Sequence, residues 1–564
     1  MTSAPDTAAV NARRQGLTRW ARALAPSRED YAHVGRTWRG DLIAGLTVGI
    51  VALPLALGFG ISSGMGAEAG LITAIVAGAL AAIFGGSPVQ VSGPTGAMVV
   101  VLAPIVATQG VGSVAAVTLM AGGIVVAAGM LGLGRAVSVI PWPVIEGFTL
   151  GIAVIIFLQQ VPQLTAAAAV SGHSANALVA TAQALVAADP AYLVWSLAAV
   201  AIVAACMLLA PRVHRAIPGS LVGILVVTAL SLVVPDPLRP IGELPNRLPA
   251  PALPASDGAT LGSLVLPAVT VAALAAIESL LSARVAAGMA DSGPYDPDRE
   301  LVGQGIASLG SALFGGMLAT GAIARTAVNV RSGGRSRLAA ICHALVLLTV
   351  VLIAGGAVGA IPLAALAGVL MVTSIRMVHA GTLRAILRST RSDAIAFVLT
   401  AIITVSFDLI VAVVIGVVVA GIVALRSLSR ASAVHEEAIA GPAAPGDERI
   451  AILRFDGPLF FAAADRVYAE ASARQDVSVV ILRMSTLELV DATGARMLGD
   501  IVQTLERRGV TVLIKGVQPR HESLFRTVGV LASLRHHNHL FTDLPTAVAH
   551  ARDHVRRERQ SRTT

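Results

Sequence analysis

The stretch from Ser92 to Thr108, Ser-Gly-Pro-Thr-Gly-Ala-Met-Val-Val-Val-Leu-Ala-Pro-Ile-Val-Ala-Thr, opens with a Gly-Pro turn and continues as an apolar run. A hydrocarbon core about 30 Å thick needs about 20 apolar residues per helix, so the run at 94–108 is too short to cross it. A second short run, 322–330, follows Thr320 and Gly321 in the other half of the chain. The two runs predict a pair of half-helices that begin inside a membrane.

The composition around these runs is that of a membrane protein. Of the 564 residues, 55% are hydrophobic and 13% are charged, whereas soluble proteins carry about 25% charge. Between Asp41 and Gly134 the only charged residues are Asp41 and Glu68. The net charge of +8 comes largely from arginines in short loops between apolar runs, a pattern that sets orientation and does not form a nucleic-acid-binding face.

Longer apolar runs surround the two half-helices. They lie at 42–60, 69–85, 112–131, 138–160, 190–210 and 219–235 in the first half, and at 262–284, 301–318, 338–356, 359–378, 392–406 and 408–425 in the second. With one short run each, both halves contain seven segments, and an odd number repeated must enter the membrane with opposite orientation. The predicted fold class is an α-helical polytopic membrane protein of 14 transmembrane segments, arranged as two inverted seven-segment repeats.

The loop arginines agree with this count. Arg135, Arg212 and Arg331 all fall on the N-terminal side, whereas 160–189 has no Lys or Arg. By the positive-inside rule the N-terminal side is cytoplasmic. Only the loop at 236–257 departs from the pattern, because its two arginines would lie outside. We therefore expect a multi-pass protein of the inner (plasma) membrane with both termini in the cytoplasm.

After Arg430 the chain changes to a soluble pattern of strands and helices. Strands are predicted at Ile450–Phe455, Val477–Leu482 and Val510–Lys515, and helices at Ala462–Ala473, Thr493–Arg508, Glu522–Val528 and Pro545–Arg556. This is a small α/β domain. The expected organisation is a cytoplasmic N-terminal segment (1–40), a transmembrane domain (41–428), a linker (429–448), the α/β domain (449–556) and a C-terminal tail (557–564).

Two half-helices that begin in mid-membrane would direct their N-termini at one small volume. Helix N-termini present unpaired backbone N–H groups and a positive dipole end, which together make an anion site. Small residues let a ligand approach the backbone, and Arg325 adds a full positive charge. Alternatively, either segment alone is only a kinked helix with small packing residues. The candidate ligands are Thr95, Gly96, Ala97, Ala322, Ile323, Ala324, Arg325 and Thr326.

Glu278 stands in an uncharged run, Ala272–Leu281. A carboxylate there is costly unless it is protonated, paired or hydrated, so it is a functional candidate. Ser282 lies four residues later on the same helical face. The pair could hold Na⁺ through its oxygens, Glu278 alone could carry a proton, or Glu278 could be a structural partner of Arg325.

Several longer motifs resemble those of the SulP anion transporters. They are Asp41-Leu-Ile-Ala-Gly-Leu-Thr-Val with Pro54, Gln90-Val-Ser-Gly-Pro-Thr-Gly, Glu278-Ser-Leu-Leu-Ser, Glu300-Leu-Val-Gly-Gln-Gly-Ile, and Gly321-Ala-Ile-Ala-Arg-Thr-Ala-Val-Asn followed by Arg331-Ser-Gly-Gly-Arg-Ser. The C-terminal domain resembles a STAS domain. The resemblance implies the same fourteen-segment fold, with a core domain that moves against a gate domain, usually in a homodimer.

The resemblance also implies residue roles. In such transporters the anion lies between the third and tenth segments. The first segment also lines the site, which adds Phe59 to the candidates above. In the cyanobacterial bicarbonate carriers of this family, an Asp and a Thr four residues later hold sodium. Here Glu278 and Ser282 stand at the matching positions. This departure favours a proton over sodium as the coupling ion.

In single-domain STAS regulators the residue before the Gly of an Asp-Ser-Ser-Gly motif is phosphorylated, and Thr493 matches it, in Asp491-Ala-Thr-Gly. Asp491 or Thr493 would also cap the helix that follows. Both are candidate regulatory residues, and a cytoplasmic partner is a candidate ligand of this domain.

The function predicted from the sequence is secondary active transport of a small anion, namely bicarbonate, sulfate or a dicarboxylate, by alternating access coupled to H⁺ or Na⁺. The alternatives are an anion-sensing signalling protein and an uncoupled anion conductor. We expect no enzyme activity, metal or cofactor. The expected partners are the anion, the lipid bilayer and a second copy of the chain.

Overall fold

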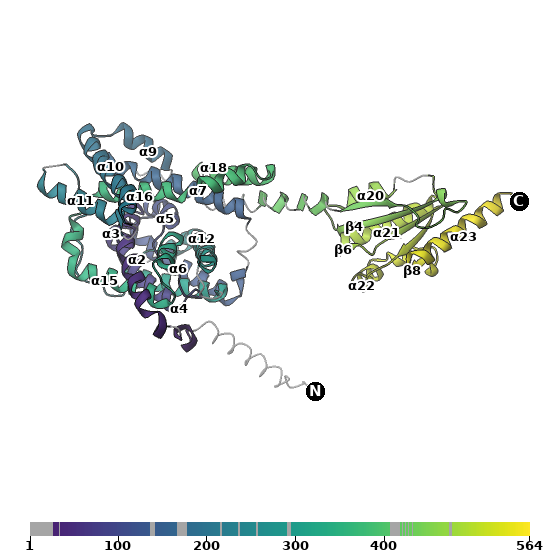
Figure 1. The fold of residues 1–564 in the computed structure, drawn as a ribbon, viewed down its shortest axis with the longest axis horizontal. Helices are drawn as coiled ribbons and strands as arrows, with labels where there is room; N and C mark the ends of the chain where they lie inside the picture. Colours follow the sequence, from purple (N-terminus) through teal and green to yellow (C-terminus); the bar gives the residue numbers. More distant parts are fainter. Residues whose placement is uncertain are drawn as a thin grey trace. The chain divides into compact units, whose positions relative to one another are not determined.

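The computed structural model divides the chain into two compact units, Met1–Val417 and Val418–Thr564 (Figure 1). Each is described by itself. The structure describes residues 26–563 except 33, 136–140, 166–176, 215–216, 235–236, 255–257, 290–294, 407–414, 416–417, 420, 424, 427, 431 and 473–475.

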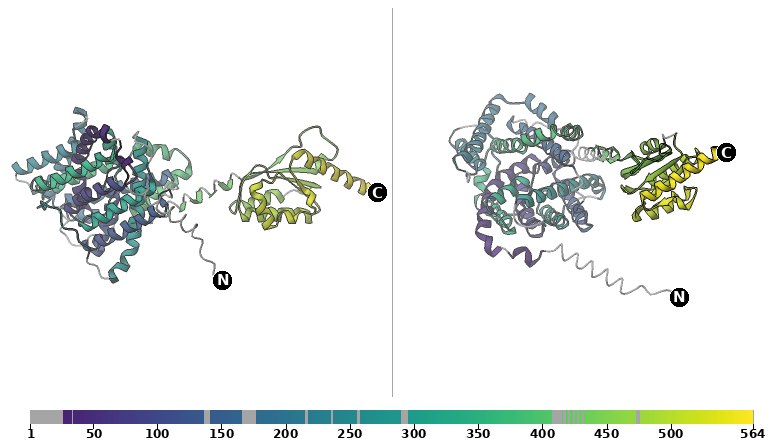
Figure 2. Two further views of the ribbon diagram at one scale, coloured as in Figure 1. Left: turned by 90° about the horizontal axis from the view of Figure 1, so that it is seen from below. Right: turned by 45° about the vertical axis from the view of Figure 1, so that its right-hand side comes forward.

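The first unit consists of apolar helices that run side by side (Figure 2). Among the described residues, eight helices are long and apolar enough to cross a membrane. The first repeat contains α2 (Val34–Ser62), α3 (Ala67–Ile72), a π-helical turn (Thr73–Ala77), α4 (Gly78–Phe84), α5 (Gly96–Gln109), α6 (Val111–Met130), α7 (Trp142–Gln159), α8 (Val161–Leu164), α9 (Ala177–Val186), α10 (Pro190–Val213) and α11 (Gly219–Val233).

The second repeat repeats this order of long and short helices. It contains α12 (Gly258–Met289), α13 (Pro297–Leu313), α14 (Ile323–Arg331), α15 (Arg337–Gly359), α16 (Leu363–Met377), α17 (Ala380–Leu387) and α18 (Arg391–Ser406). Every segment expected from the sequence up to residue 406 therefore has a helix at its place. The last expected segment, 408–425, lies mostly outside the described residues.

Several details differ from the expectation. Helix α13 spans Pro297–Leu313 rather than 301–318, because the Asp296 carboxylate caps its start and Gly315, with φ of +78°, turns the chain after its end. Helix α9 lies in the stretch between 160 and 189 that was expected to be a loop.

The two half-helices start from a pair of two-residue strands. Strand β1 (Ser92–Gly93) pairs antiparallel with β2 (Thr320–Gly321), with Ser92 opposite Gly321 and Gly93 opposite Thr320. The amide of Ala322 then donates to the carbonyl of Val91 at 2.9 Å. All four strand residues are buried. The strands satisfy backbone groups that neither half-helix could pair by itself.

Glycine lets the helices next to this strand pair approach closely. An added Cβ at Gly303 of α13 would lie 2.4 Å from the Cα of Gly85, and one at Gly70 of α3 would lie 2.0 Å from the carbonyl oxygen of Ala56 in α2. Such contacts are backbone against backbone and have no room for a methyl group. They resemble the small-residue packing that membrane helices use.

The second unit is an α/β domain with six described strands. They are β3 (Ala433–Glu437), β4 (Ile450–Leu459), β5 (Val479–Arg483), β6 (Leu487–Val490), β7 (Thr511–Lys515) and β8 (Leu540–Phe541), ordered β3-β4-β5-β7-β8, with β6 beside the end of β4. Only β3 is antiparallel to its neighbour. The helices are α20 (Ala464–Ser472), α21 (Ala492–Arg507), α22 (Pro519–Val528) and α23 (Leu544–Thr563).

Alternation along the central strand explains how helices cover both faces of this sheet. Val480 and Leu482 of β5 join the apolar core that includes α20, α21 and α22, whereas Val479 and Ile481 join the core that includes α23. Each strand and helix predicted here is present. Strand β3, however, lies within the expected linker 429–448, so the sheet begins before residue 449.

A short 3₁₀ helix, Arg28–Tyr31, precedes α2 and is tied to the second repeat. Arg299 donates to both carboxylate oxygens of Asp30, at 2.8 and 2.7 Å, and Arg337 lies 3.4 Å from it. Burial raises the pKa of Asp30, but the Arg299 hydrogen bond, the Ser27 N–H and the Arg337 charge together lower it to about 2.

We predict that Asp30→Asn destabilises the protein at neutral pH by about 2 kcal/mol, the energy that corresponds to this pKa shift. Because the folded pKa lies below the ordinary value, the stabilisation is present above about pH 4 and is lost as the pH falls through about 2. The measurement is the melting temperature of the purified full chain from pH 7 to pH 2. At pH 7 the melting temperature of the wild type should be higher than that of Asp30→Asn, and this difference should vanish near pH 2. Glu29→Gln, at the exposed neighbouring residue, is the control, and a difference that persists at pH 2 would contradict the prediction.

Candidate anion-binding site

The first turns of α5 and α14 begin at the strand pair. Thr95 and Ala322 are the N-cap residues, and neither side chain caps its own helix. The first amides bonded within each helix are those of Val99 and Thr326, so the earlier N–H groups of both half-helices have no partner in their own helix. This arrangement provides the backbone donors that an anion needs.

The two first turns differ in exposure. Thr95, Gly96 and Ala97 are buried, and a Cβ added at Gly96 would lie 2.1 Å from Cδ1 of Ile156 and 3.5 Å from Cε1 of Phe59. On the other side, Ile323 and Ala324 are exposed. Apolar side chains from α2 and α7 therefore cover the start of α5, whereas the start of α14 is open.

Glu278 of α12 meets both half-helix starts. Its Oε2 accepts hydrogen bonds from the hydroxyls of Thr95, at 2.9 Å, and Thr320, at 2.8 Å. These two hydroxyl oxygens are themselves 2.8 Å apart. Three oxygens from three segments thus form a closed triangle at the strand pair.

Arg325 lies behind the strands. Its guanidinium is 2% exposed, and Nη2 donates to the carbonyl of Pro94 at 2.5 Å. Gly93, with φ of +151°, makes room for it, because an added Cβ there would lie 2.7 Å from Nη1. Arg325 therefore supports the turn into α5 through its bond to Pro94 and adds positive charge beside both N-termini.

The Thr326 side chain is hydrogen-bonded to the segment that leads into β1. It is 1% exposed, and its hydroxyl oxygen accepts the amide N–H of Val91 at 3.0 Å. Three residues later, the Asn329 side chain donates to the carbonyl of Val89 at 2.8 Å. Both residues of α14 thus fasten the segment before the other half-helix.

Ser282 is fully buried, and within the described part of the chain its hydroxyl has no hydrogen-bond partner. It lies close to Gly321, since an added Cβ there would be 3.2 Å from Cβ of Ser282. Three residues earlier, the hydroxyl oxygen of Ser279 accepts the amide N–H of Gly321 at 3.2 Å, and the Ser279 carbonyl accepts from the Gln90 side chain at 3.2 Å.

The structure therefore brings every candidate from Thr95 to Thr326 to one place, together with Phe59, Glu278 and Ser282. It also adds Thr320 and Ser279, which the sequence analysis did not select as ligands. Thr320 was recognisable in principle, because it immediately precedes the Gly that opens the second half-helix. Ser279 carried no such signal, because the sequence does not show which way a single serine faces on α12.

In the α/β domain Asp491 has a structural role. Its carboxylate caps α21 through the amide of Gly494, at 2.7 Å, and also accepts the amide of Phe461 at 3.1 Å. Thr493 is exposed in the first turn of α21. A regulatory role of these two residues stays a prediction.

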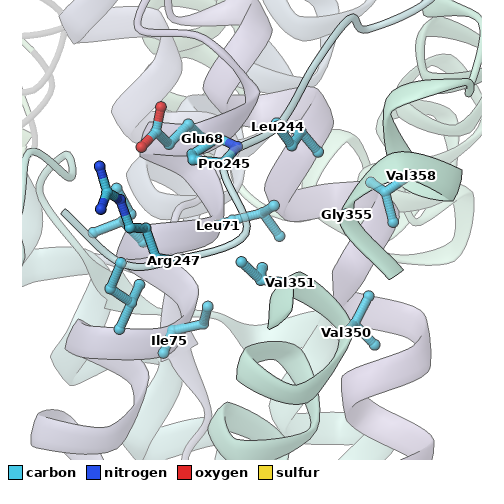
Figure 3. Close-up of a pocket in the computed structure, with 12 residues that line it drawn as sticks. Glu68, Leu71, Ile75, Leu244, Pro245, Arg247, Val350, Val351, Gly355 and Val358 are labelled. Carbon is cyan, nitrogen blue, oxygen red and sulfur yellow. The ribbon is translucent and has the colours of Figure 1, made fainter. Parts of the chain in front are cut away.

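A separate pocket lies away from the strand pair, between α3, α15 and the loop around Pro245 (Figure 3). Glu68 and Arg247 lie on one side of it, and aliphatic residues such as Leu71 and Val351 line the rest. None of the candidate ligands lines this pocket. It is therefore not the site that the half-helices form.

Comparison with known proteins identifies the family. The chain matches the sulfate permease family over residues 38–400 and the STAS domain over residues 441–547. The chain belongs to the sulfate permease family. YvdB of Bacillus subtilis, whose name provisionally assigns it sulfate transport, is 34% identical over 502 residues, which cover 87% of this chain and 93% of YvdB. The bicarbonate transporter BicA of Synechocystis sp. is 32% identical over 506 residues, which cover 85% of this chain and 88% of BicA.

Solved structures agree with this assignment. The transmembrane domain of a cyanobacterial BicA matches with a TM-score of 0.61 and 33% identity, over 67% of this chain and 98% of that domain. The structure of SLC26A9 matches with a TM-score of 0.78 over 93% of this chain and 92% of SLC26A9, and at 17% identity this likeness shows the fold alone.

The predicted family, the fold class and the STAS domain are thereby confirmed. Because the relatives are named as transporters, the sulfate permease family member described here is a multi-pass membrane transporter and not an enzyme.

We predict that Gly321→Ala disrupts the strand pair, because the added Cβ would lie 1.5 Å from Nε2 of Gln90. Overpacking of this kind costs about 1–3 kcal/mol. Combining it with Gln90→Ala should recover part of the lost melting temperature. Gly112→Ala, which meets nothing within 4 Å, is the control. A single Gly321→Ala variant as stable as the wild type would contradict the geometry.

Proposed function

We propose that this protein is a secondary active transporter that moves a small anion across the inner membrane by alternating access. One observation carries the proposal: two half-helix N-termini start from one antiparallel strand pair, with a carboxylate bonded to both starts. Backbone N–H groups at helix ends favour an anion, and the carboxylate supplies a group whose charge can change with the transport cycle.

The substrate we propose is bicarbonate, sulfate or the carboxyl group of a dicarboxylate. The names of the relatives include bicarbonate and sulfate transporters. Backbone N–H groups can donate to any of these anions, since each anion presents several acceptor oxygens. The covered first turn of α5 and the open first turn of α14 support entry of the anion from the side of Ile323 and Ala324.

The oxygen triangle supports a proton as the coupling ion. If Thr95 and Thr320 both donate to Glu278, no hydrogen lies between their own oxygens, so the three contacts of 2.8–2.9 Å need a third hydrogen. A proton on Glu278 supplies it when Glu278 donates to one threonine, which in turn donates to the other. An ionised Glu278 would instead leave one pair of oxygens in contact without a hydrogen between them, which is repulsive.

Protonation of Glu278 would also favour anion binding. An ionised carboxylate at the half-helix starts repels a bound anion, and in a site of low dielectric this repulsion is strong. Neutralising Glu278 removes the repulsion, so proton and anion each raise the other's affinity. This reciprocity is the thermodynamic basis of symport. Ser282 next to Glu278 is the residue through which Na⁺ would be held if sodium were the coupling ion.

We also propose that the protein acts as a homodimer, that both termini lie in the cytoplasm, and that the STAS domain regulates transport, with Thr493 exposed for a partner or a modification. The resemblance to the family supports these points.

The experiment that tests the function is uptake of labelled bicarbonate, sulfate and fumarate into proteoliposomes, under an inward proton gradient and separately under an inward sodium gradient. Accumulation of one anion under the proton gradient is expected. Flux without accumulation would indicate an uncoupled conductor, and binding without flux would indicate a sensor.

We predict that Glu278→Gln abolishes proton-driven accumulation but retains exchange of the anion, because Gln is neutral at every pH and cannot carry the proton. The measurements are gradient-driven uptake and counterflow of the same labelled anion. Glu68→Gln, which changes an exposed carboxyl in the first turn of α3, is the control. Undiminished accumulation in Glu278→Gln would remove Glu278 from the coupling step.

A further inference from the structure

Gln304 lies one helical turn after Glu300 in α13, and each is 1% exposed. Its side-chain nitrogen donates to Oε1 of Glu300 at 2.8 Å and to Oγ of Ser92 at 2.5 Å. Ser92 opens β1, three residues before Thr95. One amide group therefore connects α13 to the strand from which the first half-helix starts.

The chemistry of Glu300 sets the direction of this amide. Its other carboxylate oxygen accepts the backbone N–H groups of Gly86, at 2.8 Å, and Ser87, at 3.0 Å. An ionised carboxylate accepts only, so in that state the nitrogen of Gln304 and not its oxygen faces it. The second hydrogen of that nitrogen is then directed to Ser92.

The segment from Gly86 to Ser92 is held along its whole length. Glu300 fastens its start and Gln304 its end, while Asn329 and Thr326 hold Val89 and Val91 from α14. The start also fits closely against α13, because a Cβ at Gly86 would lie 1.9 Å from the carbonyl oxygen of Asp296. Displacement of this segment would shift β1 and, with it, Thr95 and the first turn of α5.

We propose that Gln304 is a positioning residue of the anion site, which acts through Ser92 to fix the start of the first half-helix. The inference rests on the proposed function, since it concerns the site where the anion binds. Binding constellations need their groups held within about 0.5 Å, and a buried hydrogen bond to the strand provides that restraint. Gln304 itself does not touch the anion.

A purely structural role of Gln304 predicts a different result. Loss of general stability lowers the amount of folded transporter and thus the maximal rate, while KM for the anion stays the same. Loss of positioning raises KM, because the donors no longer match the anion. A variant that changes only the maximal rate has lost stability, whereas a variant that raises KM has lost positioning.

The test measures KM and maximal rate for labelled sulfate and labelled bicarbonate in proteoliposomes of the full chain. Gln304→Leu keeps the volume and removes the donors, and Ser92→Ala removes the acceptor. Ser92→Ala should raise KM about tenfold, as expected for one lost buried hydrogen bond. Gln304→Leu also removes the bond to Glu300 and should raise KM at least as much. The double variant should have the same KM as Gln304→Leu, because that change already removes the bond to Ser92. Ser92→Thr, which keeps the hydroxyl, should stay near the wild type.

Thr118→Val is the matched control. Thr118 is fully buried in α6, its hydroxyl has no hydrogen-bond partner among the described residues, and it contacts none of the site residues discussed above through a hydrogen bond. The change removes a buried polar group as Gln304→Leu does. Its KM should equal that of the wild type.

Amide hydrogen exchange of residues 86–98 in the same full-length variants gives a readout that does not depend on transport. Exchange in Gln304→Leu should be about tenfold faster than in the wild type and in Thr118→Val. An unchanged KM in Gln304→Leu overturns the proposal. If the wild type transports none of bicarbonate, sulfate and fumarate, the proposed function fails separately. Exchange then decides whether Gln304 holds the segment: faster exchange supports this role and unchanged exchange overturns it.

Discussion

The rest of this structure depends on one physical constraint, which is that two helices begin inside the transport domain. A helix end leaves backbone groups without partners, and a membrane interior has no water to satisfy them. The antiparallel pairing of Ser92–Gly93 with Thr320–Gly321 satisfies part of this need and places the two ends together. The amides that remain unpaired are the donors of the proposed anion site. The same deficiency in hydrogen bonding thus creates both the structural problem and the binding capacity.

Several buried polar residues of the core gather around this strand pair. Glu278 bonds to both half-helix starts, Arg325 supports the turn at Pro94, and Thr326 and Asn329 reach back to the segment before β1. Arg325, Thr326 and Asn329 each bond to a backbone group that regular secondary structure would otherwise have paired. The two repeats are therefore joined by polar side chains where their helices are interrupted.

The STAS domain follows a different logic. Its stability comes from an alternating strand pattern that places apolar residues on both faces of a largely parallel sheet, each face covered by helices. Asp491 shows how a motif residue can serve the fold, since its carboxylate caps α21 and holds Phe461 at the same time. Thr493 beside it is exposed, and its regulatory role stays a prediction.

The lengths and spacing of the apolar runs were sufficient to predict the membrane segments, the two half-helices and the α/β domain, because segment length against bilayer thickness and alternation along strands are local properties of the chain. The candidate anion site was predictable as a set of segments, since helix N-termini at matching places in two repeats must face each other. The contacts within the site were not. Thr320 lies 42 residues from Glu278, and Ser92 lies 212 residues from Gln304, and only packing decides which of their side chains meet.

Arg325 illustrates the same division. Its position at the start of the second half-helix is readable from the chain, and it does place positive charge beside both N-termini. Whether its guanidinium faces the anion or the opposite side of the strands depends on the space that Gly93 leaves behind β1, and there the side chain bonds to Pro94. Local sequence thus determined which groups stand at the site, whereas the tertiary structure decided their directions, because a side chain's direction follows from the neighbours that distant segments bring to it.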